Sequence, residues 1–467
     1  MSYPNIRTMS PKVAVDQVDI NTKYISHRLF VVSYCFHDRQ RCQITPGRCF
    51  HLKNMRNRRG ALNFVMLFLL GIVLLANGGC GGSGKSESSA SPFAGGVGTP
   101  EAPYRIATAG QLAKIKDYRD KSFILISDID LSSYSNWDPI GTFNMEIDDP
   151  EKGEVAKSSL AFVGRFDGNG HTISNLTVNR PDTFCVGLFG FVVGNAAFPS
   201  IRNLTVSNAD VKGACMVGGV VGAINGRITD IELTGVNKVE GYRIGAVGGM
   251  VGMGYGAIEN CTANASVTSN GKGIQGIGLI CGGGKWLTVR ACTAAGNVTA
   301  KGFGAFSVGG LVGCIQESPV MENCAVKATI DASAEKSFMV GGLTGHAGNY
   351  DRSNPTLIRN CSADVDITVS PSSKRVGGLI GGNLFVSAFL EEHPTPSLYR
   401  ITGCATSGSI KGNASQVGSI AGYGYDSSVT DCTSALVWSG GAIEQVGLMH
   451  GAGDTPDPIG LDYYAGE

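Results

Sequence analysis

Val308-Gly-Gly-Leu-Val-Gly313, followed after seven intervening residues by Met321-Glu-Asn-Cys324, is one unit of a pattern that recurs along this chain. The glycine-rich run recurs at 217–222, 247–252, 277–282, 340–345, 376–381 and 417–422, and a shorter form stands at 186–190. Successive runs start 30 to 41 residues apart. A repeat of this length predicts that each unit is one supersecondary element that stacks on its neighbours.

Two further positions keep a fixed offset within each unit. A four-residue anchor that begins with an apolar residue follows each run, and in six units it ends in a cysteine: Cys261, Cys292, Cys324, Cys361, Cys404 and Cys432. Six residues after the cysteine, five successive units have an apolar residue: Val267, Val298, Ile330, Ile367 and Ile410. Fixed offsets of this kind predict that equivalent residues stack in columns.

The unit divides into three short segments with alternating apolar residues, separated by Gly, Asn and Ser. Period-two segments of this length are typical of strands, and nothing between them is long enough for a helix. Coils stacked about 4.8 Å apart satisfy every backbone group and make one core. We expect the glycines to permit left-handed corners and close contact between coils, so Gly252→Val or Gly313→Val should be destabilising. The fold class is therefore predicted as an all-β, single-stranded parallel β-helix.

The repeat resembles the GLUG repeat, named for its Gly-Leu-any-Gly core and found in bacterial adhesin-like proteins. It is also similar to repeats in streptococcal IgA-cleaving metalloendopeptidases. Upstream, the stretches from Tyr104, Phe123, Trp137 and Phe162 resemble the entry coils of such proteins, so the resemblance covers about 104–438. It implies a right-handed parallel β-helix on a bacterial cell surface and no particular activity. The chain has no HExxH motif, so the metallopeptidase activity is not carried over.

The first eighty residues have the character of an export signal. An apolar run of 16 residues at 61–76 follows Arg56, Arg58 and Arg59, which fits a secretory signal with translation starting at Met55. Cys80 then opens a Gly/Ser tether and resembles the lipidated cysteine of bacterial lipoproteins, which predicts a membrane anchor. The alternative is ordinary signal cleavage within 76–78, which would release the protein. Since 1–59 is strongly basic and the chain is neutral overall, the remainder is acidic, which argues against nucleic acid as a partner.

These patterns predict a division of the chain into six parts. They are a misassigned or disordered leader at 1–54, a signal peptide at 55–80, a Gly/Ser-rich linker at 81–102, a cap with entry coils at 103–182, β-helix repeats at 183–438 and a C-terminal cap or tail at 439–467. Thr108 and Gln111 form a capping-box pattern, so we expect a short helix over 109–119 that covers the N-terminal end of the core.

The residues that could take part in catalysis or metal binding are all interpreted here as structural. The cysteine column is expected to be a buried stack of free thiols, because the Cβ bonds of stacked neighbours run parallel. Asp167-Gly-Asn-Gly-His171 is interpreted as a tight turn, and Asp128 and Asp130 as acceptors of backbone hydrogen bonds. No metal and no cofactor are expected.

Two long units depart from the repeat through insertions after Gly345 and Gly381, at the same corner of adjacent coils. Insertions on one face of a solenoid are where binding surfaces are built. The candidate ligand-binding residues are Tyr350, Asp351, Arg352, Phe385, Phe389, Glu391, Glu392, His393 and Tyr399. Aromatic platforms with charged neighbours suit a glycan or a host or matrix protein, although a tolerated surface loop would give the same pattern.

The sequence therefore favours a non-catalytic surface lipoprotein, or secreted protein, that presents a β-helix for adhesion. The first alternative is a carbohydrate-active β-helix enzyme, a polysaccharide lyase or hydrolase. Such enzymes place carboxylates, Lys or Arg in a row on consecutive coils, whereas the outward positions here are mostly Thr, Asn, Ala and Ser. The second alternative is a purely structural spacer. The identity of the ligand and the oligomeric state do not follow from the sequence.

Overall fold

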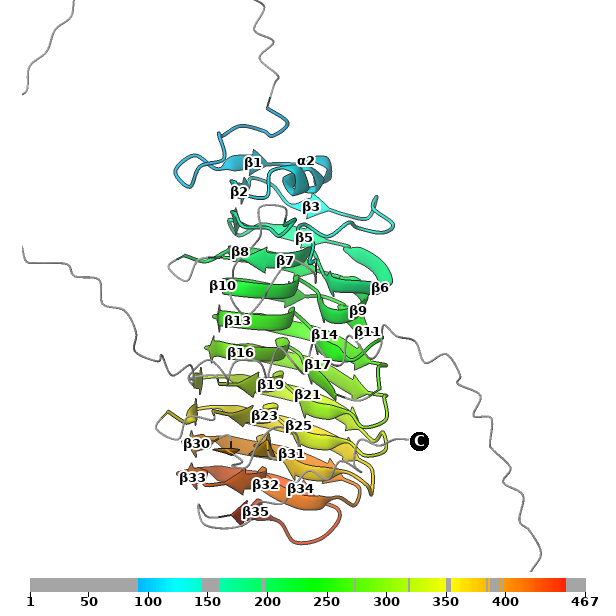
Figure 1. Cartoon of the computed structure of the whole chain (residues 1–467), viewed down its shortest axis with the longest axis vertical. Coiled ribbons are helices and arrows are strands. Elements are labelled where there is room, and N and C mark those ends of the chain that lie inside the picture. The colour runs from blue at the N-terminus through cyan, green and yellow to red at the C-terminus, as the bar shows by residue number, and fades with distance from the viewer. Residues whose placement is uncertain are drawn as a thin grey trace, which may run out of the picture. The chain divides into compact units, whose positions relative to one another are not determined.

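The computed structural model describes residues 91–144, 159–194, 198–272, 274–317, 320–349, 354–383, 385–386, 395–396 and 398–450. In these ranges the chain forms a stack of coils in which each strand lies parallel to its equivalent in the next coil (Figure 1). The predicted parallel β-helix is thus confirmed. The predicted leader, the signal peptide and Cys80 lie outside the described residues.

Each repeat coil contributes strands to four ladders of parallel strands. The Val-Gly ladder contains β6 (Thr177–Val186), β9 (Asp210–Gly218), β12 (Gly245–Gly248), β15 (Ile274–Gly278), β18 (Phe306–Gly309), β22 (Phe338–Gly341), β26 (Lys374–Gly377) and the start of β32 (Ser415–Tyr425). The Leu-Val-Gly ladder contains β7 (Phe189–Val193), the starts of β10 (Val221–Thr234), β13 (Val251–Glu259) and β16 (Cys281–Arg290), then β19 (Val312–Gln316), β23 (Thr344–Gly348), β27 (Ile380–Gly382), the end of β32, and β35 (Glu444–His450).

The other two ladders carry the anchor and the segment after the cysteine. The anchor ladder contains β4 (Arg165–Asp167), β8 (Ile201–Ser207), the later parts of β10, β13 and β16, then β20 (Val320–Glu322), β24 (Thr356–Arg359), β30 (Tyr399–Thr402) and β33 (Ser428–Thr430). The last ladder contains the starts of β6 and β9, then β11 (Lys238–Gly241), β14 (Thr262–Ser269), β17 (Thr293–Ala300), β21 (Ala325–Ala332), β25 (Ser362–Val369), β31 (Ala405–Lys411) and β34 (Thr433–Trp438). The entry coils add β1 (Tyr104–Ile106), β2 (Ser122–Leu125), β3 (Ile129–Asp130) and β5 (Thr172–Ser174), and β28 (Phe385–Val386) and β29 (Thr395–Pro396) form a separate antiparallel pair.

Equivalent apolar residues form a continuous column inside the stack. Val267 pairs with Val298, Val298 with Ile330, and Ile330 with Ile367, which in turn pairs with Ile410. All five side chains are buried. The column predicted from the sixth position after the cysteine is therefore confirmed, and it forms part of one hydrophobic core.

The glycine-rich run forms two strands rather than the single segment expected from the alternation. β18 ends at Gly309 and β19 begins at Val312, so the chain bends between them. After the bend, Gly313 lies against the backbone of the preceding coil, and a Cβ built there would stand 2.2 Å from the Ile277 nitrogen. Only a residue without a Cβ allows two backbones to approach this closely.

The left-handed corners of the anchor are occupied mainly by asparagine and aspartate, and the glycines of the runs, which were expected to permit such corners, do not occupy them. Asn260, Asn323 and Asn360 have φ values of 54°, 54° and 52°, whereas Gly252 and Gly313 do not have positive φ. Asparagine tolerates this region because its short amide bonds locally. The glycines of the runs thus serve close packing, and the asparagines turn the chain.

The N-terminal end of the core is covered as predicted. Helix α2 (Ala109–Lys114) continues into the short 3-10 helix η2 (Ile115–Asp117), and the Thr108 side chain accepts a hydrogen bond from the Gln111 N–H at 3.2 Å. Phe93, which the sequence placed in the linker, is buried against the ring of Tyr104, so the cap begins earlier than expected. At the other end, β35 adds a further parallel strand within the predicted C-terminal cap.

Candidate functional site

The two long insertions leave the solenoid at the same corner, between the Leu-Val-Gly strand and the anchor strand of their coils. Their bases contact each other, because the backbones of Asn349 and Leu398 form an isolated antiparallel bridge. The Asn349 N–H donates to the Leu398 carbonyl at 3.0 Å, and the Leu398 N–H donates back at 2.7 Å. We call the corner formed by Asn349, Leu398, β28 and β29 the insertion edge. The prediction that the insertions lie side by side is confirmed at their bases.

Most of the predicted ligand-binding residues belong to the outer parts of these insertions. Those that lie outside the described residues are Tyr350, Asp351, Arg352, Phe389, Glu391, Glu392 and His393. Phe385 lies in β28, for which the structure describes the backbone pairing and not the side chain. Ligand contact by these residues stays a prediction.

The prediction for Tyr399 as a surface aromatic is wrong. Tyr399 is the first residue of β30, and its side chain is 0% exposed. Its hydroxyl donates a hydrogen bond to the Tyr423 carbonyl at 2.7 Å, and burial raises the pKa of the phenol. Tyr399 follows the insertion and already lies at an inward-facing position of β30, so its side chain packs inside the solenoid beneath the insertion edge.

A buried polar network, which the sequence analysis missed, lies beneath the insertion edge. Arg375 donates from Nη1 to the Asn383 carbonyl at 2.9 Å, and its guanidinium lies 3.6 Å from the centroid of the Tyr423 ring. The Asn383 amide donates to the Tyr425 carbonyl at 3.1 Å and accepts from the Tyr425 N–H at 3.2 Å. These contacts fix the start of the second insertion. The available signal was Arg375 itself, because no other unit has a charged residue before the same position of the run.

His346 is a second buried polar residue in this part of the solenoid. It pairs with Gly382 in the next coil, and its side chain is fully buried. Burial is the main cause that lowers the pKa of His346 to about 3, and the nearby charge of Arg375 acts in the same direction. The imidazole is therefore neutral in the folded protein at ordinary pH.

Trp286 is an exposed aromatic residue near the insertion edge that the repeat pattern alone does not reveal. Its indole Nε1 donates to Glu317 Oε2 at 3.0 Å, and the Glu317 N–H donates to the Gly348 carbonyl at 2.9 Å. Gly348 directly precedes Asn349, so this cluster adjoins the insertion edge. The available signal was one extra residue between Cys281 and the following anchor, compared with the preceding unit.

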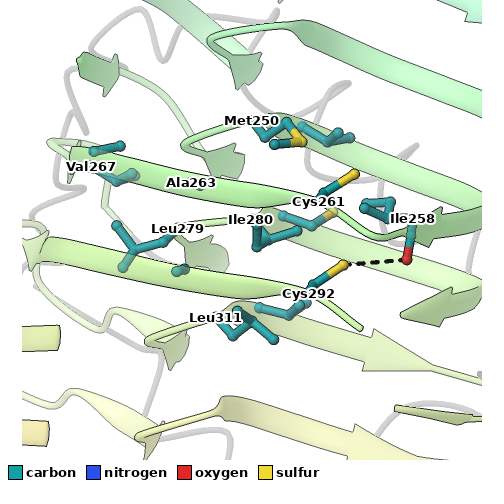
Figure 2. Close-up of a cluster of buried hydrophobic side chains, with 14 of the residues drawn as sticks. Met250, Ile258, Cys261, Ala263, Val267, Leu279, Ile280, Cys292 and Leu311 are labelled. Carbon is teal, nitrogen blue, oxygen red and sulfur yellow. Dashed lines mark hydrogen bonds between the residues drawn. The ribbon is translucent and has the colours of Figure 1, made fainter. Parts of the chain in front are cut away.

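The cysteine column is a stack of free thiols inside the solenoid, as predicted, although Cys432 is only partly buried. Figure 2 shows Cys261 and Cys292 among apolar side chains, with the Cys292 thiol directed toward the Ile258 carbonyl, at 3.5 Å. Each of the six thiols also donates to the carbonyl two residues before it, at 3.2 Å in five cases and 3.4 Å in Cys404. All six are free, and the neighbouring thiols together with burial raise the pKa of Cys292. Over the described ranges, no group of three metal-ligating side chains is present.

The expectation that no row of charged residues follows consecutive coils is wrong. Arg227, Glu259, Arg290, Glu322 and Arg359 follow one another along one face, and each glutamate is paired to an arginine on both sides. The ion pairs span 3.6 Å for Arg290 with Glu259 and 3.2 Å for Arg359 with Glu322. Because the signs alternate, the carboxylates are occupied by neighbouring guanidinium groups. The row joins coils rather than leaving a free acid and base.

The acidic residues of the entry coils are engaged as predicted. Asp128 accepts from the Thr172 N–H at 2.9 Å, and Asp130 accepts from the Ser132 N–H at 2.9 Å. Bonds to backbone N–H groups lower the pKa of Asp128, as bonds from Asn175 and Ser132 do for Asp130. In the predicted tight turn, Asn169 has a φ of 51°, and its N–H bonds to the Asp167 carboxylate at 2.8 Å.

Comparison with known proteins identifies the repeat. Residues 337–368 match the family model described as the GLUG motif. The chain is 36% identical to Halomucin from Haloquadratum walsbyi over 162 residues, which are 34% of this chain and 2% of that protein. It is 33% identical to a "Putative Gly-rich membrane protein" from Evansella cellulosilytica over 160 residues, 32% of this chain and 16% of that protein. The chain therefore spans a small part of the length of these relatives.

Among solved structures, the chain is similar to the crystal structure of a "putative immunoglobulin A1 protease" from Bacteroides ovatus. The match has 21% identity and a TM-score of 0.42, and it covers 74% of this chain and 87% of that one. Within the described part of this chain, no helix is long and apolar enough to cross a membrane. The coil at 337–368 is thus a GLUG motif, and it lies within a stack of like coils.

Proposed function

We propose that this protein is a non-catalytic, exported cell-surface protein whose β-helix presents the insertion edge to a glycan or a protein ligand. The observation that carries the proposal is the bridge between Asn349 and Leu398. It brings two insertions from different coils to one place on the solenoid. Surface loops held on a rigid scaffold are the usual location of binding residues.

The buried network below the insertion edge supports the same proposal. A binding loop needs a fixed base, because ordering it at the moment of binding weakens affinity. Arg375, Asn383 and Tyr399 provide such a base through hydrogen bonds inside the solenoid. A spacer without a ligand would have no need for a buried arginine at the one coil where the longest insertion starts.

Export and anchoring form the second part of the proposal. The basic and apolar segments at 56–76 direct the chain to the secretory pathway, and a lipid on Cys80 retains it at the membrane. Growth of an expressing bacterium with radioactive palmitate tests the anchor. We expect label in the wild-type protein and none in Cys80→Ala, whereas an unlabelled wild-type protein excludes lipidation and leaves a secreted product.

The binding proposal is tested by probing the full chain against an array of glycans and matrix proteins. The matched variant replaces 387–394 with two glycines, which retains Asn383, β28, β29 and Tyr399 and so keeps the buried base intact. We expect the wild type to bind at least one ligand and this variant to lose it. A reducing-end assay on the same polysaccharides tests the enzyme alternative, since product formation would contradict a non-catalytic role. Absence of binding on the whole array would favour the spacer.

A further inference from the structure

The strand β16 contains a bulge that turns Trp286 away from the core. Along β13 and β16, Gly254 pairs with Gly284 and Gly256 pairs with Leu287, so Trp286 is the extra residue in the ladder. The preceding pair, β10 and β13, runs through the same positions without interruption. The fold itself therefore does not require the extra residue. Bulges of this kind redirect a side chain and are frequent next to binding sites.

The backbone at the bulge is held in a conformation that tryptophan disfavours. Trp286 has a φ of 54°, in the left-handed region where bulky residues are rare. The indole is 40% exposed, so no gain in core packing offsets this strain. Strained backbone of this kind persists where the surrounding structure enforces it, and it is frequent in functional sites.

Two charged side chains hold the exposed ring in one orientation. The Trp286 Nε1 donates to Glu317 Oε2 at 3.0 Å, and the Lys285 ammonium lies 4.5 Å from the indole centroid. Lys285 also lies 3.8 Å from Glu317 Oε1, which closes a triangle among the three side chains. The lysine side chain is 6% exposed and the glutamate 30% exposed, so the polar atoms open to solvent beside the ring are mainly those of a carboxylate.

We infer that Trp286, Lys285 and Glu317 form a carbohydrate subsite that takes a pyranose ring of a neutral glycan. An oriented indole offers a flat apolar surface to the C–H face of a sugar, and a carboxylate at its edge accepts hydrogen bonds from sugar hydroxyls. Because the buried lysine compensates the glutamate while the carboxylate is the more exposed, acidic sugars are disfavoured. A protein partner would require a wider apolar surface around the tryptophan, and its immediate partners are charged.

The subsite lies next to the insertion edge. The inference that both contact one ligand rests on the proposed function. Glu317 contacts Trp286 through its side chain and Gly348 through its backbone, and Gly348 adjoins Asn349 at the base of the first insertion. A glycan chain bound at Trp286 and running along the solenoid axis would reach the insertions two and three coils away. The subsite and the insertions then act as separate contacts on one ligand.

The test is affinity electrophoresis of the full chain in gels that contain a soluble neutral polysaccharide, such as β-glucan, mannan or galactan, or an acidic one, such as alginate. We expect at least one neutral polysaccharide to retard the wild type, and we expect Trp286→Ala to weaken its affinity by about tenfold or more. Trp286→Phe, which keeps a ring, should retain part of the binding. The matched control is Tyr242→Ala, because Tyr242 is also 40% exposed and also bonds to a glutamate, Glu240, at 2.8 Å. This control should bind as the wild type does.

Several outcomes separate this inference from the proposed function. If a neutral polysaccharide retards the protein and Trp286→Ala binds it as tightly, the subsite is wrong, while loss of binding in the 387–394 variant would still support the insertion edge. Retardation by alginate alone, or Trp286-dependent binding to a matrix protein only, overturns the glycan assignment. If no glycan binds, the subsite is also overturned. Thermal unfolding of each variant checks the fold, and Trp286→Gly serves as a second variant because it removes the ring and relieves the positive φ.

Discussion

Gly313→Ala is the substitution that most directly probes the close contact between coils. A Cβ at this position would lie 2.2 Å from the Ile277 nitrogen, 2.3 Å from the Gly282 oxygen and 2.6 Å from the Gly276 carbonyl carbon. All three atoms belong to backbone, so no flexible side chain can move aside. Inserting one methyl group into a packed core costs about 1–3 kcal/mol, and we expect the upper end of this range or more.

The assay for this substitution is equilibrium unfolding in guanidinium, followed by far-UV circular dichroism. The matched control is Gly110→Ala in α2, where a Cβ has nothing within 4 Å and φ is not positive. This control should be stabilised by about 0.5–1 kcal/mol, because alanine favours the helix. A Gly313→Ala protein within about 0.5 kcal/mol of the wild type would refute the argument that the run glycines serve close packing.

Three further predictions follow from buried groups and corners. The pKa of His346 is lowered to about 3, whereas an unfolded histidine titrates near 6.5, so the unfolded state takes up the proton first as the pH falls. The free energy of unfolding should therefore fall by about 3 kcal/mol between pH 7 and pH 4. The His346→Gln variant should lack this decrease, and an equal dependence of the unfolding free energy on pH in both proteins would contradict the prediction. Thiol titration without reductant should find Cys261, Cys292, Cys324, Cys361, Cys404 and Cys432 all free in denaturant, and six missing thiols would contradict the column. In native protein Cys432, which is partly exposed, should react before the other five. At the left-handed corner, Asn360→Val should lower the unfolding free energy by about 1–2 kcal/mol and Asn360→Gly by a few tenths, as measured by thermal unfolding, and equal losses would contradict the corner geometry.

The columns of the solenoid are predictable from sequence because they depend only on equal offsets. Val267, Val298 and Ile330 occupy one position in successive units, and a strand with one buried face permits only one register. The capping helix is predictable for a similar reason, since Thr108 and Gln111 act locally. Features of this kind can be predicted without a structure, because they depend only on the repeat and on residues close in sequence.

The details of the insertion edge depend on where the repeat is interrupted, and there the sequence pattern is insufficient. The repeat pattern places Tyr399 in an exposed insertion, although the residue occupies the inward position of β30. Trp286 differs from its neighbours by a single inserted residue, and only the pairing of β13 with β16 shows that the indole faces outward. The alternating row that includes Glu259 and Arg290 likewise becomes visible only when the register is known. An inserted residue changes the face of the strand on which the following side chains lie, and the alternation of apolar residues does not predict where such insertions occur.

The central claim is that successive units lie directly over one another and share one interior. Methyl NMR spectroscopy of protein labelled at Ile, Leu and Val methyl groups tests it directly, through cross-relaxation between residues about thirty positions apart. Stacked coils predict strong cross-peaks from Val298 to both Val267 and Ile330. Assigned methyl groups of these three residues without mutual cross-peaks, or with the relaxation behaviour of solvent-exposed groups, would contradict the solenoid and the insertion edge that it supports.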